Sequence, residues 1–110
     1  MKIAIPANDK FIAKHFGHCP IFKVFSIEDQ KITAEPSIEN PGNHQPGVIP
    51  LLLKHHEIDV IIAGGMGQKA INFFNDMNIK VIVGVSGLIE NILNQFINGT
   101  LESGDNSCHH

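Results

Sequence analysis

The chain has 110 residues, 43% of them hydrophobic, and a formal net charge of -3 at pH 7. This length suits one domain whose core needs no disulfide staples. The absence of arginine and the scattering of the eight lysines argue against a nucleic-acid partner, because phosphate recognition relies on clustered basic side chains. No window reaches the roughly 18 to 20 apolar residues of a membrane span, and the amino terminus reads as a strand rather than a signal peptide. We therefore expect a cytoplasmic protein with neither nucleic acid nor membrane as partner.

The first half of the chain predicts three strands. Apolar runs bounded by turn signals place them at residues 2–5, 21–27 and 31–35, and a short polar turn at residues 28–30 joins the last two as a hairpin. The next stretch, PSIENPGNHQPG, holds three prolines and two glycines. We expect it to form an exposed loop.

The second half alternates between helix and strand. Helical spacing predicts helices that begin at Val48, after the turn GGMG, and after an N-cap at Ser86, the last of them ending near Gly99. Near-continuous apolar runs predict buried strands at residues 59–63 and 80–83.

The order βββαβαβα requires right-handed crossovers between parallel strands, next to an antiparallel hairpin. We therefore expect a single α/β domain over residues 1–110. It should have a five-stranded mixed sheet of the ribonuclease H-like type with flanking helices, followed by a flexible tail at residues 100–110.

Three segments should meet at the carboxyl edge of this sheet, where ligands collect in α/β folds. They are HFGHC at 15–19, GGMG at 64–67 and NHQPG at 43–47, which contains His44. In the first segment, His15, His18 and Cys19 offer imidazole and thiolate donors that suit iron, zinc, copper and metal-sulfur clusters. A structural interpretation stays open, in which the histidines are merely exposed, Phe16 anchors the loop and Cys19 is buried as a small hydrophobe.

The glycine turn Gly64, Gly65 and Gly67 lies between a strand and a helix, an arrangement in which backbone amides and the helix dipole attract an anion. It lacks the lysine and the Ser/Thr of a P-loop. The alternative is a tight turn that allows close packing of the helix.

The chain has two cysteines, and in a reducing compartment such a pair more often binds metal or takes part in redox chemistry than forms a bridge. The second, Cys108, stands beside His109 and His110 in a polar tail that could fold over a site as a tethered ligand. The tail could also be a disordered end or an artificial extension. His55 and His56 end a helix, where cations suit the macrodipole, and are interpreted as structural.

Two segments resemble the dinitrogenase iron-molybdenum cofactor biosynthesis family. These are HFG at 15–17, followed by an apolar strand, and VIIAGGMGQKA at 60–70, and the likeness covers nearly the whole chain. A Cys and a His near the carboxyl terminus resemble the family's small stand-alone members. The resemblance implies a ribonuclease H-like fold that binds iron-molybdenum cofactor, its iron-sulfur precursor or a related molybdenum cluster. It implies ligands at His15, His18 and Cys19, and an anion-facing wall at Gly64, Gly65 and Gly67. Ligand chemistry alone adds His44, Cys108 and His109.

We expect a cluster carrier rather than an enzyme. A site of cysteines alone needs four thiolates, so binding must be mixed or shared, and few ligands with histidines among them suit a carrier that releases its cargo. A metal-dependent nuclease would need carboxylates on the central strands, where the first strand carries Ile3, Ala4 and Ile5. The alternative function is a small-anion or nucleotide-binding regulatory module that uses Gly64–Gly67. Cofactor-assembly proteins are the expected partners, and the chain should be a monomer or a weak homodimer.

Overall fold

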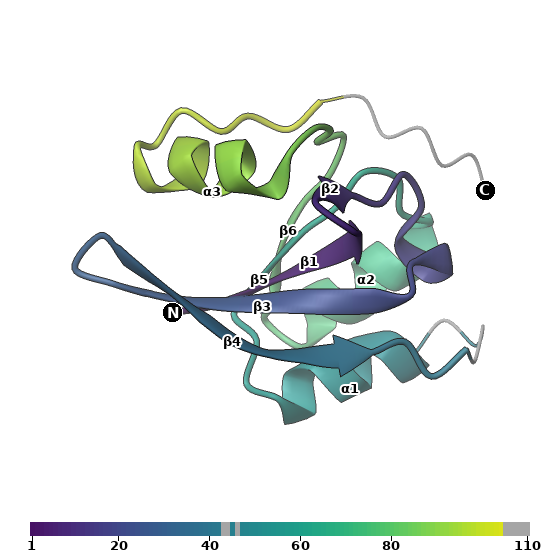
Figure 1. Ribbon diagram of the computed structural model, residues 1–110. Coiled ribbons are helices and arrows are strands. Elements are labelled where there is room, and N and C mark those ends of the chain that lie inside the picture. The colour runs from purple at the N-terminus through teal and green to yellow at the C-terminus, as the bar shows by residue number, and fades with distance from the viewer. Residues whose placement is uncertain (43–44, 46, 105–110) are drawn as a thin grey trace.

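The computed structural model describes residues 1–42, 45 and 47–104, and in that part of the chain six strands form one mixed sheet (Figure 1). The order across the sheet is β4-β3-β1-β5-β6, and the short β2 pairs with the end of β1. The strands are β1 Lys2–Asn8, β2 Phe11–Ile12, β3 Ile21–Glu28, β4 Lys31–Glu39, β5 Val60–Ile62 and β6 Lys80–Ile82.

Parallel and antiparallel pairs divide the sheet. Strands β1, β5 and β6 are parallel, whereas β3 runs antiparallel to both β1 and β4. Strands β5 and β6 are linked through α2 Gln68–Asp76, as a strand-helix-strand crossover requires, and α1 Val48–His55 leads from β4 to β5. The carboxyl ends of β1, β4, β5 and β6 therefore lie at the same edge, on the right in Figure 1.

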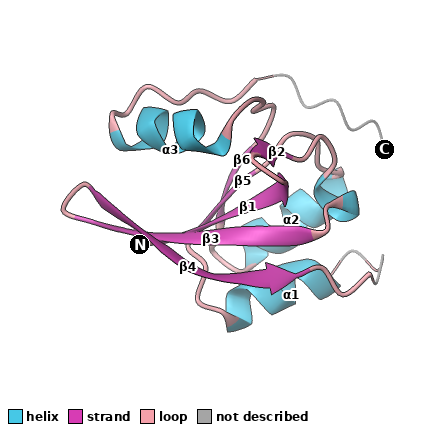
Figure 2. Ribbon diagram, viewed as in Figure 1, coloured by secondary structure: helices cyan, strands magenta, loops and turns pink. Residues whose placement is uncertain are grey.

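Helices cover both faces of the sheet, with α1 and α2 on one face and α3 Ile89–Ile97 on the other (Figure 2). Alternating side chains of β1 serve the two layers, because neighbouring residues of a strand point to opposite faces. Ile3 and Ile5 pack with Ile92 and Leu93 of α3, and Ala4 packs in the cluster under α1 and α2. The predicted mixed α/β sheet flanked by helices is confirmed, and its ribonuclease H-like type stays a prediction.

Two expectations about the first half were wrong in extent. Strand β1 continues past the predicted end at residue 5 to Asn8 and then pairs with β2, where the sequence predicted no strand. Strand β4 continues to Glu39, although Pro36 was expected to begin a loop. An edge strand tolerates proline, and a shift of register between β3 and β4 at this point leaves an extra residue unpaired.

The last helix begins later than expected. Leu88, not Ser86, is its N-cap, and Gly87 precedes it with φ of +106°, a conformation that favours glycine. The backbone N–H of Ile89 donates to the carbonyl of Lys10 at 3.0 Å, which fixes the start of the helix against β2. Gly99, with φ of +73°, follows the helix as predicted.

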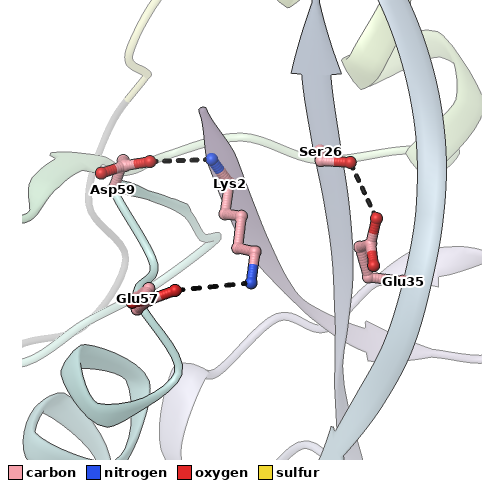
Figure 3. Close-up of polar contacts among 5 residues, drawn as sticks. All are labelled: Lys2, Ser26, Glu35, Glu57 and Asp59. Atoms are coloured by element: carbon pink, nitrogen blue, oxygen red, sulfur yellow. Dashed lines mark hydrogen bonds and ion pairs between the residues drawn. The ribbon is translucent and has the colours of Figure 1, made fainter.

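Acidic side chains gather at the opposite edge, where β1 and β5 begin (Figure 3). The carboxylate of Asp59 accepts from the backbone N–H of Lys2 at 2.8 Å, and the Lys2 ammonium lies 4.0 Å from Glu57. Figure 3 also shows Ser26 of β3 donating to Glu35 of β4 at 2.8 Å. These carboxylates support strand pairing.

Within the described ranges, the helices are too short or too polar to cross a bilayer.

Candidate functional site

The loop that carries HFGHC is bonded directly to the diglycine segment that follows β5. The backbone N–H of Phe16 donates to the carbonyl of Gly65 at 2.9 Å, and the N–H of Gly65 donates to the carbonyl of Lys14 at 2.7 Å. These bonds form an isolated parallel bridge between His15 and Gly65. Two of the three segments that the sequence assigned to this edge therefore lie side by side.

The end of β4 joins the same loop. The backbone N–H of Asn40 donates to the carbonyl of Pro20 at 3.1 Å, and its side-chain amide donates to carbonyls of the loop. Asn40 therefore lies beside HFGHC, three residues before NHQPG, and His44 itself lies outside the described residues. No role for Asn40 was predicted from the sequence. Its position before Pro41 and Gly42 indicates a turn, and an Asn side chain at such a position often bonds to the backbone of the turn.

The chain after α3 returns to this edge as well. The N–H of Gly104 donates to the carbonyl of Val83 at 3.0 Å, and the N–H of Gly84 donates to the carbonyl of Gly64 at 2.7 Å. The described chain therefore ends within two backbone hydrogen bonds of the diglycine. The predicted ligands Cys108 and His109 follow, outside the described residues.

Two exposed imidazoles form the donor pair of the loop. The rings of His15 and His18 stand edge to face with centroids 6.1 Å apart; His15 precedes a short 3₁₀ turn over Phe16–His18, and His18 ends it. Within residues 1–42, 45 and 47–104, no three His, Cys, Asp or Glu side chains are grouped so that they could hold a metal ion. The histidine pair therefore offers part of a coordination shell.

The environment of Cys19 argues against its predicted role as a ligand. Cys19 is 3% exposed and belongs to the apolar cluster under α1 and α2. Its Sγ lies 3.5 Å from the carbonyl oxygen of Phe16. Burial raises the pKa of the Cys19 thiol to about 11, against a smaller lowering by the Asn40 amide. Metal ligation needs the thiolate, so Cys19 here behaves as the small hydrophobe of the structural interpretation.

The burial of this thiol predicts a loss of stability in alkali. The pKa of Cys19 in the folded chain lies above the ordinary value of 9.0 for this thiol, so ionisation favours the unfolded chain as the pH rises from about 9 to about 11. We expect Cys19 to contribute a decrease on the order of 2 kcal/mol in the free energy of unfolding across that window. Urea titrations of the wild type and of Cys19→Ala at several pH values check it, because the variant should lack this component. Equal pH dependence of the two proteins would contradict it.

Close backbone contact accounts for Gly64, the first residue of the diglycine. An added Cβ at Gly64 would lie 2.8 Å from the carbonyl oxygen of Lys14 and 2.9 Å from that of Ala13. The amide of Gly65 already donates to Lys14, so it is not available to an anion. Gly67 is the N-cap of α2 and is partly exposed. The tight-packing alternative therefore explains Gly64, and the amide of Gly65 is bonded within the protein.

Fold and site together define a small mixed α/β domain with a pair of exposed histidines at the carboxyl edge of its sheet. The model of the dinitrogenase iron-molybdenum cofactor family matches residues 1–99, and the chain belongs to this family. That membership confirms the resemblance and supports a role in cofactor-related processes.

Known proteins are similar to this chain over nearly its whole length. The protein MJ0580 of Methanocaldococcus jannaschii is 31% identical over 106 residues, which cover 93% of this chain and 90% of that protein. The crystal structure of the protein PH0822 has a TM-score of 0.84 at 34% identity, over 94% of this chain and 96% of that one. The apo form of the orange protein from Desulfovibrio gigas has a TM-score of 0.76 at 20% identity, over 96% and 93% of the two chains, and shows the fold alone.

Proposed function

We propose that the protein binds and carries a metal-sulfur cluster, of the iron-molybdenum or iron-sulfur type, at the carboxyl edge of its sheet. The observation that carries this proposal is the exposed His15 and His18 pair, held by backbone bonds against the glycine segment after β5. Imidazole nitrogens are suitable donors for the iron atoms of such a cluster. Membership of the cofactor family supports a metal-sulfur cargo over an isolated ion.

The ligand count favours a carrier over a permanent cluster site. Two histidines leave much of a cluster without protein ligands, and protonation of imidazole weakens the bond to the metal. Cargo held in this way can be passed on. We propose that cofactor-assembly proteins load and unload it, and that the protein itself catalyses no reaction.

The tail can supply the missing thiolate. Cys108 is four residues beyond Gly104, and a chain of four residues reaches at most about 14 Å. Gly104 in turn is bonded to the strand end beside Gly84 and, through it, to Gly64. We propose that Cys108 and His109 act as tethered ligands, which raises their effective concentration at the histidine pair.

Anaerobic reconstitution with iron, sulfide and molybdate tests the proposal. The wild type should retain metal and show visible absorption after desalting. The double variant His15→Ala/His18→Ala should retain at least about tenfold less, since even the loss of outer partners of a metal site costs about 10- to 100-fold in affinity.

The chain offers a matched control. His55 and His56 also stand edge to face, with centroids 5.8 Å apart, but they lie at the end of α1 that leads to the start of β5. His55→Ala/His56→Ala should therefore retain metal like the wild type. Equal losses in both double variants would mean adventitious binding by histidine pairs. Absence of any uptake by the wild type would refute the carrier function and leave the small-anion module, which the bonded amide of Gly65 does not favour.

A further inference from the structure

One side chain at the end of β4 holds the histidine-bearing loop from outside. The amide nitrogen of Asn40 donates to the carbonyl of Cys19 at 2.8 Å and to the carbonyl of Gly17 at 3.3 Å. The same nitrogen lies 3.9 Å from Sγ of Cys19, so the two N–H groups of this amide serve three acceptors of the loop. The two carbonyls flank His18 in sequence, and the amide therefore spans the half of the loop that carries the second imidazole.

The other polar groups of Asn40 fix the residue itself. Its amide oxygen accepts from the N–H of Gly42 at 2.9 Å, and its backbone N–H donates to the carbonyl of Pro20 at 3.1 Å. Asn40 is partly buried, so its bonds compete less with water than bonds on an open surface would. The residue links the loop to the start of the segment that leads to α1.

The two ends of the loop are anchored by different partners. The Phe16 N–H is bonded to Gly65, which fixes His15, whereas the carbonyls on either side of His18 are bonded to Asn40. The N–H of His18 also donates to the carbonyl of His15 at 3.2 Å, so the spacing of the two imidazoles depends on this bond within the turn and on the two outer anchors.

We propose that Asn40 is a positioning residue for metal binding, which sets the place of His18 relative to His15. This inference rests on the proposed function, because it assumes that both imidazoles are ligands. Without the amide, the loop of the free protein is less ordered, and metal binding must order it. The affinity for metal therefore falls by the free-energy cost of that ordering. Two neutral hydrogen bonds make the expected loss about tenfold.

The test uses Co²⁺ as the probe, with its affinity measured by calorimetry on the full chain. Asn40→Asp keeps an oxygen for the N–H of Gly42 but puts a second oxygen against the carbonyls of Gly17 and Cys19. Its added negative charge would by itself strengthen cation binding, so weaker binding cannot come from charge. Asn40→Ala removes the hydrogen-bond donor without adding repulsion, and it replaces Asn40→Asp in the test if that variant folds poorly. Asn91→Ala, on an exposed position of α3, is the matched control.

We expect both Asn40 variants to bind Co²⁺ about tenfold more weakly than the wild type and Asn91→Ala. Backbone ¹⁵N relaxation should show greater mobility at residues 17–19 of the folded variants, a local effect that a general loss of stability would not give. Unchanged Co²⁺ affinity in folded Asn40→Ala overturns the positioning role. The variant His15→Ala separates this proposal from the proposed function. If neither His15→Ala nor Asn40→Ala changes Co²⁺ binding, the histidine site itself is refuted. If His15→Ala weakens binding and Asn40→Ala does not, only the role of Asn40 is refuted.

Discussion

Gly64→Ala is expected to lower the free energy of unfolding by about 2 to 3 kcal/mol and to reduce cluster retention at least tenfold. The new methyl group would lie 2.8 Å from the Lys14 carbonyl oxygen and 2.9 Å from that of Ala13. Both neighbours are backbone atoms, and no rotamer change can move them. The strand end and the loop must therefore separate, which strains the bonds between Gly65 and the loop that place His15.

Gly17→Ala is the matched control, because Gly17 lies in the same loop and an added Cβ there meets nothing within 4 Å. Urea denaturation and reconstitution of both variants measure the two effects. We expect Gly17→Ala to stay within about 0.5 kcal/mol of the wild type and to retain its metal. A Gly64→Ala protein as stable and as metal-rich as the wild type would show that the loop does not depend on this contact.

Hydrophobic periodicity was sufficient to predict five of the strands and the three helices, although not all of their ends. The near-continuous apolar runs at β5 and β6 and the helical spacing at α2 each depend on local sequence, so they survive without tertiary information. The two-residue strand β2 has too little sequence to show a period. It is held by two backbone bonds to other segments. The N–H of Ala13 donates to the carbonyl of Pro6 across a turn, and the N–H of Ile12 donates to the carbonyl of Gly87, which is distant in sequence.

The meeting of the site segments was also predictable, whereas the state of individual donors was not. Topology alone brings the ends of β1, β4 and β5 to one edge. Whether a thiol at that edge faces solvent depends on side-chain packing, and Cys19 turns into the cluster that also holds Phe16 and Phe22. Spacing in HFGHC could not distinguish this burial from exposure, because a loop has no fixed period.

The glycine turn shows the same limit. A glycine at the end of a strand is equally suited to an approaching anion and to an approaching backbone, and both interpretations were open from the sequence. The contact that decides between them comes from Lys14, some fifty residues earlier in the chain. Only the folded arrangement reveals that partner.

Phe16→Ala is expected to cost about 3 to 4 kcal/mol in the free energy of unfolding and to weaken metal binding as well. The Phe16 ring is buried beneath the loop, with centroids 5.8 Å from Phe22 and 5.5 Å from Phe74. Truncation leaves a cavity under the 3₁₀ turn and removes favourable ring contacts. Because the imidazoles flank this residue, the loss of its anchor frees both of them.

Thermal and urea unfolding, with Co²⁺ titration at a temperature where each variant is folded, separate stability from binding. Phe16→Leu should recover most of the stability, since leucine fills much of the space, and with it most of the affinity. Phe11→Ala is the matched control, because Phe11 is 54% exposed and should cost less than about 1 kcal/mol. If folded Phe16→Ala bound Co²⁺ as tightly as the wild type, the backbone bonds to Gly65 and Asn40 would be sufficient to hold the histidines. If binding fell in Phe16→Ala and recovered in Phe16→Leu, the apolar core itself would maintain the geometry of the metal-binding loop.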